Sequence, residues 1–191
     1  HPVKDFVNKL AWDGKSRVAT MTTSWFNSDE TSLSKAINRT FLKMAIKRIM
    51  EPGCRIEYSL LLNGVRKSDL HTFCERLSAG LGLAVNVDTK EARKYAPILN
   101  RSWICLMDEL IGHDYKQQDR IKDVVRRSKD IFIPPYKTYH ITNQRHCVFI
   151  GSTSNEKFLK ENSIEPCVKY WIINCGNIDK DYICNNFDDE T

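Results

Sequence analysis

The sequence predicts an α/β fold, in which a largely buried β-sheet is covered by helices on both faces. Two observations lead to this prediction. Short apolar runs are typical of strands buried on both faces, and along the chain they alternate with segments of helical periodicity. This alternation is the pattern of an α/β sheet. The strand-like runs are Tyr58–Leu62, Leu83–Val87, Trp103–Met107, Cys147–Ile150 and Tyr170–Ile173.

Length and composition indicate one domain, or one domain with a small helical appendage. A chain of 191 residues with 41% hydrophobic content is enough for one core. The formal net charge of +5 is compatible with a nucleic-acid partner. Seven cysteines occur singly, which favours reduced thiols in a cytoplasm over a disulfide framework. No apolar run reaches membrane-spanning length, and the start at His1 indicates an excised fragment.

Residues 1–52 are predicted to form an N-terminal helical subdomain. A short amphipathic helix is expected around Phe6 to Leu10, followed by a turn at Trp12–Lys15. A longer helix is predicted over Ser32–Met50 and ends at Glu51–Gly53. Its apolar face carries Leu33, Ile37, Phe41, Leu42, Ala45, Ile46 and Ile49, and its other face carries Lys35, Arg39, Lys43, Lys47 and Arg48. The basic face is either a solvated surface or a nucleic-acid surface.

The stretch that organises the core, residues 53–184, is Tyr58–Gly80. It reads as a buried strand, a glycine loop beginning at Gly64, and a helix that ends at Gly80. P-loop proteins bind phosphate in the loop between such a strand and such a helix, because the N-terminus of the helix directs free N–H groups at the anion. The loop has the first glycine and the right length, but not the glycine, lysine and serine that should end it.

The rest of the core continues the alternation. Helices are predicted around Lys90–Leu99 and over Gln118–Ser128, and a hairpin or kinked strand pair is predicted from Ile131–Ile133 and Tyr139–Ile141. The acidic residues 185–191 are expected to form a frayed tail.

Polar residues after two of the strands fall in the order that an NTPase needs. Asp108 and Glu109 follow Trp103–Met107, where an aspartate would hold Mg²⁺ and a glutamate would polarise the attacking water. Ser152–Asn155 follow Cys147–Ile150, where a sensor residue would contact a γ-phosphate. Either group also reads as an ordinary polar strand end.

Several segments of the chain match one family. The most specific is Arg145–Thr153, and the others are His1–Asp5, Trp12–Lys15, Glu51–Cys54, Thr72–Phe73, Ala79–Gly80, Trp103–Ile104, Glu109 and Pro135–Tyr136. With them the chain resembles the virulence-associated protein E family, P-loop proteins related to superfamily 3 helicases that are found beside primases in phages and mobile elements. The resemblance implies a P-loop NTPase-like (AAA+/superfamily 3 helicase-like) core and a replication-linked ATPase, often assembled as a ring.

The chain departs from this family at the phosphate loop. Aligned without gaps, Asp69 replaces the last loop glycine, Leu70 the phosphate-binding lysine and His71 the Mg²⁺-binding hydroxyl, while Gly64 and Thr72 remain. A carboxylate at Asp69 would repel the β-phosphate by about 4 kcal/mol at about 4 Å. In this register Asp69→Gly, Leu70→Lys and His71→Ser together are expected to recover nucleotide binding.

A second register remains open. Lys67 and Ser68 serve as the lysine–serine pair if the loop is three residues shorter, at the expense of the backbone nest around the phosphates. Elsewhere, Ser154 stands where the resemblance implies a sensor asparagine, with Asn155 one place late. Lys169, after Val168, stands where an arginine pair is expected, which removes the charge that stabilises a transition state.

The sequence therefore predicts a helicase-like P-loop ATPase-family module of a mobile-element or phage replication protein, with ATP hydrolysis weak or lost. One alternative is an active DNA-dependent ATPase that uses the shortened loop, ATP and Mg²⁺. The other is a non-catalytic scaffold that binds nucleic acid or other subunits, including copies of itself. The predicted DNA phosphate contacts are Lys43, Lys47, Arg126, Arg127, Lys137 and Arg145.

Overall fold

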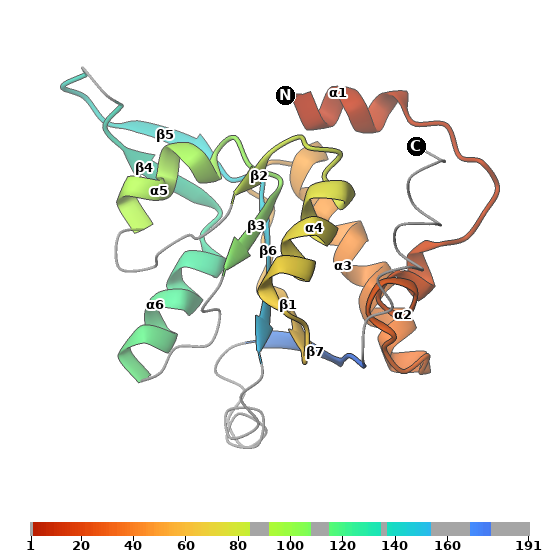
Figure 1. The fold of residues 1–191 in the computed structure, drawn as a ribbon. Coiled ribbons are helices and arrows are strands. Elements are labelled where there is room, and N and C mark those ends of the chain that lie inside the picture. The colour runs from red at the N-terminus through yellow and green to blue at the C-terminus, as the bar shows by residue number, and fades with distance from the viewer. Residues whose placement is uncertain (1, 85–91, 108–114, 135–136, 154–168, 177–191) are drawn as a thin grey trace.

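A five-stranded sheet with helices on both faces forms the centre of the computed structural model, which describes residues 2–84, 92–107, 115–134, 137–153 and 169–176 (Figure 1). The N-terminal elements are α1 (Pro2–Lys9), η1 (Val18–Thr20), α2 (Met21–Phe26) and α3 (Ser32–Met50). The core elements are β1 (Tyr58–Asn63), α4 (Lys67–Leu77), β2 (Leu83–Ala84), α5 (Ala92–Leu99), β3 (Ile104–Met107), α6 (Tyr115–Arg126), β4 (Lys129–Phe132), β5 (Ile141–Gln144), β6 (Val148–Thr153) and β7 (Lys169–Asn174).

The strands of this sheet lie in the order β2-β3-β6-β1-β7, and every described pairing is parallel. Strand β1 lies between β6 and β7, with Leu60 opposite Ile150 on one side and Trp171 on the other. Because parallel strands end at the same edge, Asn63, Met107 and Thr153 mark one carboxyl edge of the sheet. The predicted α/β fold is confirmed.

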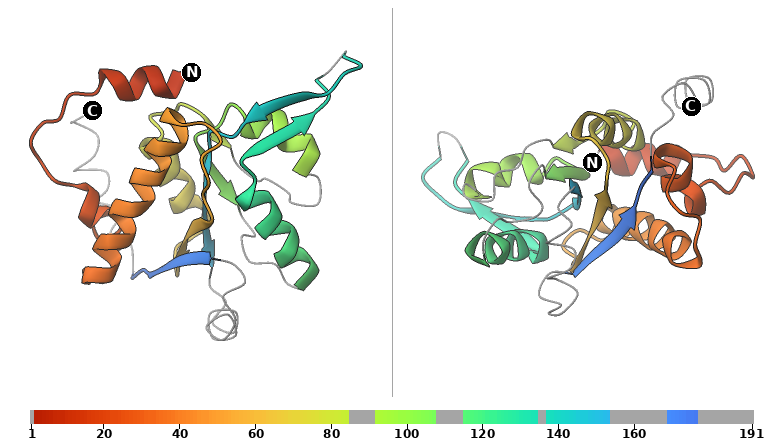
Figure 2. Two further views of the ribbon diagram at one scale, coloured as in Figure 1. Left: turned by 180° about the vertical axis from the view of Figure 1, so that it is seen from behind. Right: turned by 60° about the horizontal axis from the view of Figure 1, so that its bottom comes forward.

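Alternation along the strands creates two cores, one on each face of the sheet. Leu60 and Leu62 pack with α1 to α4, whereas Leu61 between them packs with α5 and α6. Figure 2 shows α3 and α6 on opposite sides of the strands. The central strand is therefore buried on both faces, as its unbroken apolar sequence requires.

Helix α3 has the predicted bounds, and it begins with a capping box in which Thr31 and Ser34 bond each other's backbone N–H groups. Phe41 and Ala45 are fully buried in the same cluster as Leu60. The helices of residues 1–52 thus share a core with the sheet, and the predicted boundary at residue 52 does not separate two cores. Residues 185–191 lie outside the described residues.

Two side chains of α3 lie opposite to their predicted faces. Leu33, expected on the apolar face, is 67% exposed in the first turn of the helix. Arg48, expected on the basic face, is fully buried, and its Nη2 donates to the carbonyl of Arg127 at 2.7 Å. Periodicity alone did not locate this contact, because the acceptor lies 79 residues away in the chain.

The predicted hairpin is present as the antiparallel pair β4–β5, and a buried ion pair fixes its base. The guanidinium of Arg145, after β5, bonds both carboxylate oxygens of Asp130 in β4, with Nε to Oδ2 at 2.9 Å, and also donates to the carbonyl of Val124 in α6. Burial opposes the charged form of Arg145, but the hydrogen bonds to Asp130 outweigh it, so the pKa of Arg145 lies above its ordinary value. One arginine therefore connects the hairpin, α6 and the start of β6.

Among the described residues, no helix is both long and apolar enough to span a membrane.

The buried pair predicts a large loss of stability in Asp130→Ala. Removing this carboxylate leaves Arg145 buried without its counter-charge, which typically costs about 3–5 kcal/mol of unfolding free energy. The matched control is Asp123→Ala, because Asp123 pairs with Arg127 at the surface, where such a pair contributes about 0–1 kcal/mol. Urea unfolding followed by circular dichroism measures both. Equal losses in the two variants would show that the Arg145–Asp130 pair contributes no more than a surface pair.

Candidate functional site

The carboxyl end of β1 is closed by backbone contacts that require glycine at Gly64. Its N–H donates to the carbonyl of Thr153 at 2.8 Å, and the N–H of Cys175 donates to Asn63 at 2.9 Å. Gly64 has φ +89°, and a Cβ there would lie 3.0 Å from the carbonyl oxygen of Cys175. The predicted phosphate loop thus begins where expected, at the carboxyl edge of the sheet and between two neighbouring strands.

The loop that follows is only three residues long. Helix α4 begins at Lys67, so Gly64, Val65 and Arg66 alone separate it from β1. The ungapped register, which continues the loop as far as Thr72, therefore does not describe this connection. The physical reason is the apolar spacing of Leu70 with the later core residues of α4, which extends the amphipathic helix toward its N-terminus.

Three residues predicted in the loop therefore occupy the first turns of α4. Leu70, at the lysine position of the ungapped register, is fully buried in the core. The carboxylate of Asp69 accepts from Nε of Arg66 at 2.9 Å. Nδ1 of His71 lies 3.9 Å from Oε2 of Glu75. In this geometry Leu70→Lys places an ammonium in the core, which argues against recovery of nucleotide binding by the triple variant; that recovery stays a prediction.

Lys67 and Ser68 are instead the first two residues of α4, and both side chains are exposed. This is the position that the shortened register assigns to a lysine–serine pair. The N–H groups of Asp69 and Leu70 already bond the carbonyl of Arg66, at 3.1 and 3.0 Å. Thr72 donates its hydroxyl to the Ser68 carbonyl at 3.1 Å. A ligand at this place would contact the N-terminus of α4 and the neighbouring residues Arg66, Lys67 and Ser68. The three-residue connection is too short to surround it.

The other predicted NTPase residues are only partly placed. Asp108 and Glu109 follow β3, and Ser154 and Asn155 follow β6, but all four lie outside the described residues. Lys169 begins β7 opposite Tyr58, at the amino edge of the sheet, whereas Gly64 lies at the carboxyl edge. Among the described residues, no group of three His, Cys, Asp or Glu side chains is placed to hold a metal ion.

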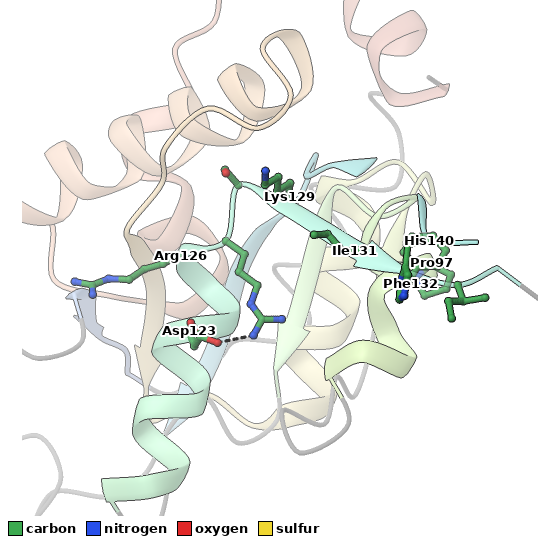
Figure 3. Close-up of a pocket in the computed structure, with 10 residues that line it drawn as sticks. Pro97, Asp123, Arg126, Lys129, Ile131, Phe132 and His140 are labelled. Atoms are coloured by element: carbon green, nitrogen blue, oxygen red, sulfur yellow. Dashed lines mark hydrogen bonds and ion pairs between the residues drawn. The ribbon is translucent and has the colours of Figure 1, made fainter. Parts of the chain in front are cut away.

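A second candidate site is an open groove of about 1090 Å³ between α5, α6 and β4. Figure 3 shows Arg126 at the end of α6, projecting away from Pro97 and His140 at the far end of the groove. The lining is Pro97, Asp123, Arg126, Arg127, Ser128, Lys129, Ile131, Phe132, Ile133 and His140. Apart from Asp123, which pairs with Arg127, its charged side chains are basic. The sequence pattern indicated the two arginines but not Lys129 and Phe132, which are the first and last residues of β4.

A third basic region lies on the opposite side of the sheet, on α3. Arg39, Lys43 and Lys47 are exposed and border a groove of about 500 Å³. Lys47 also pairs with Glu51 at 3.7 Å. The predicted DNA contacts Lys43 and Lys47 are thus at the surface, on a different face from Arg126.

The two remaining predicted DNA contacts differ from each other. Lys137 is exposed, with its ammonium 6.0 Å from the centre of the Tyr139 ring. Arg145 is 1% exposed and bound to Asp130, so the prediction that it contacts a DNA phosphate is wrong. A guanidinium held by a buried carboxylate has no path to a surface phosphate.

Comparisons with known proteins are consistent with this fold. The model of the virulence-associated protein E-like domain matches residues 7–189. Two solved structures, both described as the A form apo structure of the NrS-1 C-terminal region, match with TM-scores of 0.56 and 0.54 at 14% and 12% identity. Each match covers 93% of this chain, which spans only 40% and 42% of those chains. No curated protein matches the sequence.

The geometry at Gly64 predicts a measurable cost of adding one methyl group. Gly64→Ala combines a left-handed backbone with a close approach to the Cys175 carbonyl, a strain of about 1–3 kcal/mol. Gly14→Ala is the matched control, because Gly14 has φ +85° but no described atom within 4 Å of its Cβ position. Thermal unfolding should therefore show a lower midpoint for Gly64→Ala than for Gly14→Ala. Equal midpoints would contradict the tight closure at Cys175.

Proposed function

The chain belongs to the family of virulence-associated protein E-like domains, and on this premise we propose that it is a helicase-like P-loop module of a phage or mobile-element DNA replication protein, with ATP hydrolysis weak or lost. Support comes from the parallel sheet, in which a central strand ends at Gly64 and leads directly into a helix. Parallel α/β sheets bind ligands at the carboxyl ends of their strands. ATP and Mg²⁺ are its cofactors if the module is active, and an inactive module needs none.

The observation that carries the proposal is the short connection between β1 and α4. A phosphate loop works because successive backbone N–H groups surround the anion and a lysine neutralises it. The three residues between β1 and α4 offer few backbone N–H groups to surround a phosphate. Leu70 is buried where the ungapped register needs the lysine, and Asp69 adds a carboxylate to the first turn of α4. Weak nucleotide binding follows from these three facts together.

An active ATPase is the second candidate, and the start of α4 is what favours it. Lys67 and Ser68 lie at the helix N-terminus, where the helix dipole favours an anion and a lysine can reach it. Arg66 is exposed beside them but already pairs with Asp69. In this version Asp108 binds Mg²⁺ and Glu109 polarises the attacking water.

The nucleotide proposal predicts that ATP with Mg²⁺ binds no more tightly than about 1 mM, near −4 kcal/mol. Isothermal titration calorimetry of the chain measures this affinity. The matched pair of variants is Lys67→Ala and Arg76→Ala, which remove one cation from the first or the last turn of α4.

Each outcome of that titration has a distinct meaning. Micromolar binding that is lost in Lys67→Ala and kept in Arg76→Ala would overturn the proposal in favour of the active ATPase. Micromolar binding that survives Lys67→Ala would show that neither register describes the site.

Nucleic-acid binding is the part of the proposal that the basic surfaces support. Lysine and arginine side chains that neutralise DNA phosphates release counterions, which requires no fixed motif. The groove beside α6 combines Arg126 and Lys129 with the apolar side chains of Ile131 and Phe132. Cations next to apolar and aromatic groups are the composition of sites that track single strands with little sequence preference. Other copies of the chain or other replication subunits are further proposed partners.

The groove predicts weak, salt-sensitive and sequence-tolerant DNA binding. Arg126→Ala and Lys129→Ala should each weaken binding to unrelated sequences by similar factors and lower the slope of log affinity against log salt by about 1. Fluorescence anisotropy with labelled oligonucleotides at several salt concentrations measures both quantities. Arg55→Ala is the control, because Arg55 is exposed but pairs with Glu57 outside the groove. Affinity that does not change with salt would overturn the electrostatic account.

A further inference from the structure

The segment between α1 and η1 holds one tryptophan out in solvent. In Figure 1 this segment extends away from the helices at the right of the molecule and then leads back to α2. Trp12 is 81% exposed, the highest value among the exposed large apolar side chains of the described residues. An aromatic ring left in water by a folded chain is a candidate contact for a partner, because covering it is favourable.

The turn that carries Trp12 is ordered by its own hydrogen bonds. The indole N–H of Trp12 donates to the carbonyl of Lys15 at 3.3 Å, and the N–H of Lys15 donates to the carboxylate of Asp13 at 2.9 Å. Arg17 pairs with the same carboxylate at 2.6 Å. The hydrogen bond from Lys15, reinforced by Arg17, lowers the pKa of Asp13, so the carboxylate that closes the turn stays charged at neutral pH.

These bonds determine which groups of the Trp12 side chain are available to a partner. Its one polar group, the indole N–H, is already used within the turn, so the faces of the ring are what a partner can meet. The chain's other tryptophans are placed differently. Trp25 and Trp103 are 7% and 4% exposed, and Trp171 stacks on Tyr58 at 4.7 Å. Trp12 is therefore presented for stacking in a way that the others are not.

The chain leads from this turn through η1 to a basic surface on α3, against which η1 packs. Val18, six residues after Trp12, lines the groove on α3 together with Leu42, Ile46 and Met50. The exposed cations Arg39, Lys43 and Lys47 border that groove, and Lys15 and Arg17 of the turn are exposed as well. The acidic side chains of the turn and the groove, Asp13 and Glu51, are paired with Arg17 and Lys47. The excess charge is positive and complements a polyanion.

We propose that the Trp12 turn and the α3 groove form a subsite for single-stranded nucleic acid, separate from the groove beside α6. In this subsite the indole of Trp12 stacks on an unpaired base, and Arg39 and Lys43 hold backbone phosphates. Stacking needs an exposed base face, which duplex DNA does not present along its length. A symmetric contact with the same surface of a second copy would bring like charges together and is disfavoured. The inference rests on the proposed nucleic-acid function.

The test follows the intrinsic fluorescence of the chain during titration with a short thymidine oligonucleotide at low salt, and with inorganic polyphosphate as a polyanion without bases. The oligonucleotide should quench a component that is missing in Trp12→Phe, whereas polyphosphate should bind without that quenching. Trp12→Ala should weaken oligonucleotide binding by about tenfold and leave polyphosphate binding unchanged. Trp12→Phe, which keeps an aromatic ring, should lose less.

Two control variants separate stacking from other effects. Leu33→Ala removes another exposed apolar side chain, 67% exposed on α3, and should leave both ligands unaffected. Lys43→Ala should weaken oligonucleotide and polyphosphate alike, because it contributes charge and not stacking.

The outcomes separate this inference from the broader proposal. If the oligonucleotide binds equally well to wild type and Trp12→Ala, the subsite is refuted while nucleic-acid binding stands. If the oligonucleotide does not bind the wild type at low salt, both fall. If Trp12→Ala instead lowers the mass measured by sedimentation and leaves oligonucleotide affinity unchanged, Trp12 contacts a second copy and the inference is overturned.

Discussion

The position of β1 between two parallel neighbours is the constraint on which the rest of the structure depends. Strand β1 bonds to β6 and β7 along its length and buries side chains on both faces, so it cannot shift without exposing Leu61 or Leu62. The hydrogen bonding continues past the end of β1, where the N–H of Gly64 donates to the carbonyl of Thr153 and the N–H of Cys175 donates to the carbonyl of Asn63. Every feature of the candidate nucleotide site is positioned from this fixed point.

In the first turns of α4, packing in the core and binding of a phosphate compete for the same residues. A long phosphate loop would leave Leu70 near the ligand, whereas a helix that begins at Lys67 places it in the core with Phe73. Burying a leucine side chain contributes about 1.5–3 kcal/mol, and no anion-binding gain is available to this apolar residue in return. Packing therefore determines the start of α4, and the anion site is reduced to what remains at the helix N-terminus.

The basic residues divide in a similar way between structure and surface. Arg48 and Arg145 are buried and bond other elements, Arg48 to the carbonyl that follows α6 and Arg145 to Asp130. Lys43 and Lys47 on α3, and Arg126 on α6, stay at the surface on opposite sides of the sheet. The net positive charge is thus distributed over two surfaces, and nucleic acid that contacts both would have to pass around the edge of the molecule.

The sequence by itself determined the elements and the fold class. Apolar runs and helical periodicity are local properties, and they predicted α3 at its observed bounds and β1 to within one residue. The second strand of the hairpin, β5, instead lies at Ile141–Gln144 and shares only Ile141 with the predicted strand. The sequence also located Gly64, because only glycine meets the conformational requirement at that turn. Tertiary structure alone decided the strand order, the length of the loop after Gly64, and which arginines are buried. These depend on contacts between distant residues, such as Arg48 with Arg127 and Arg145 with Asp130, and no local pattern records where a partner far along the chain will lie.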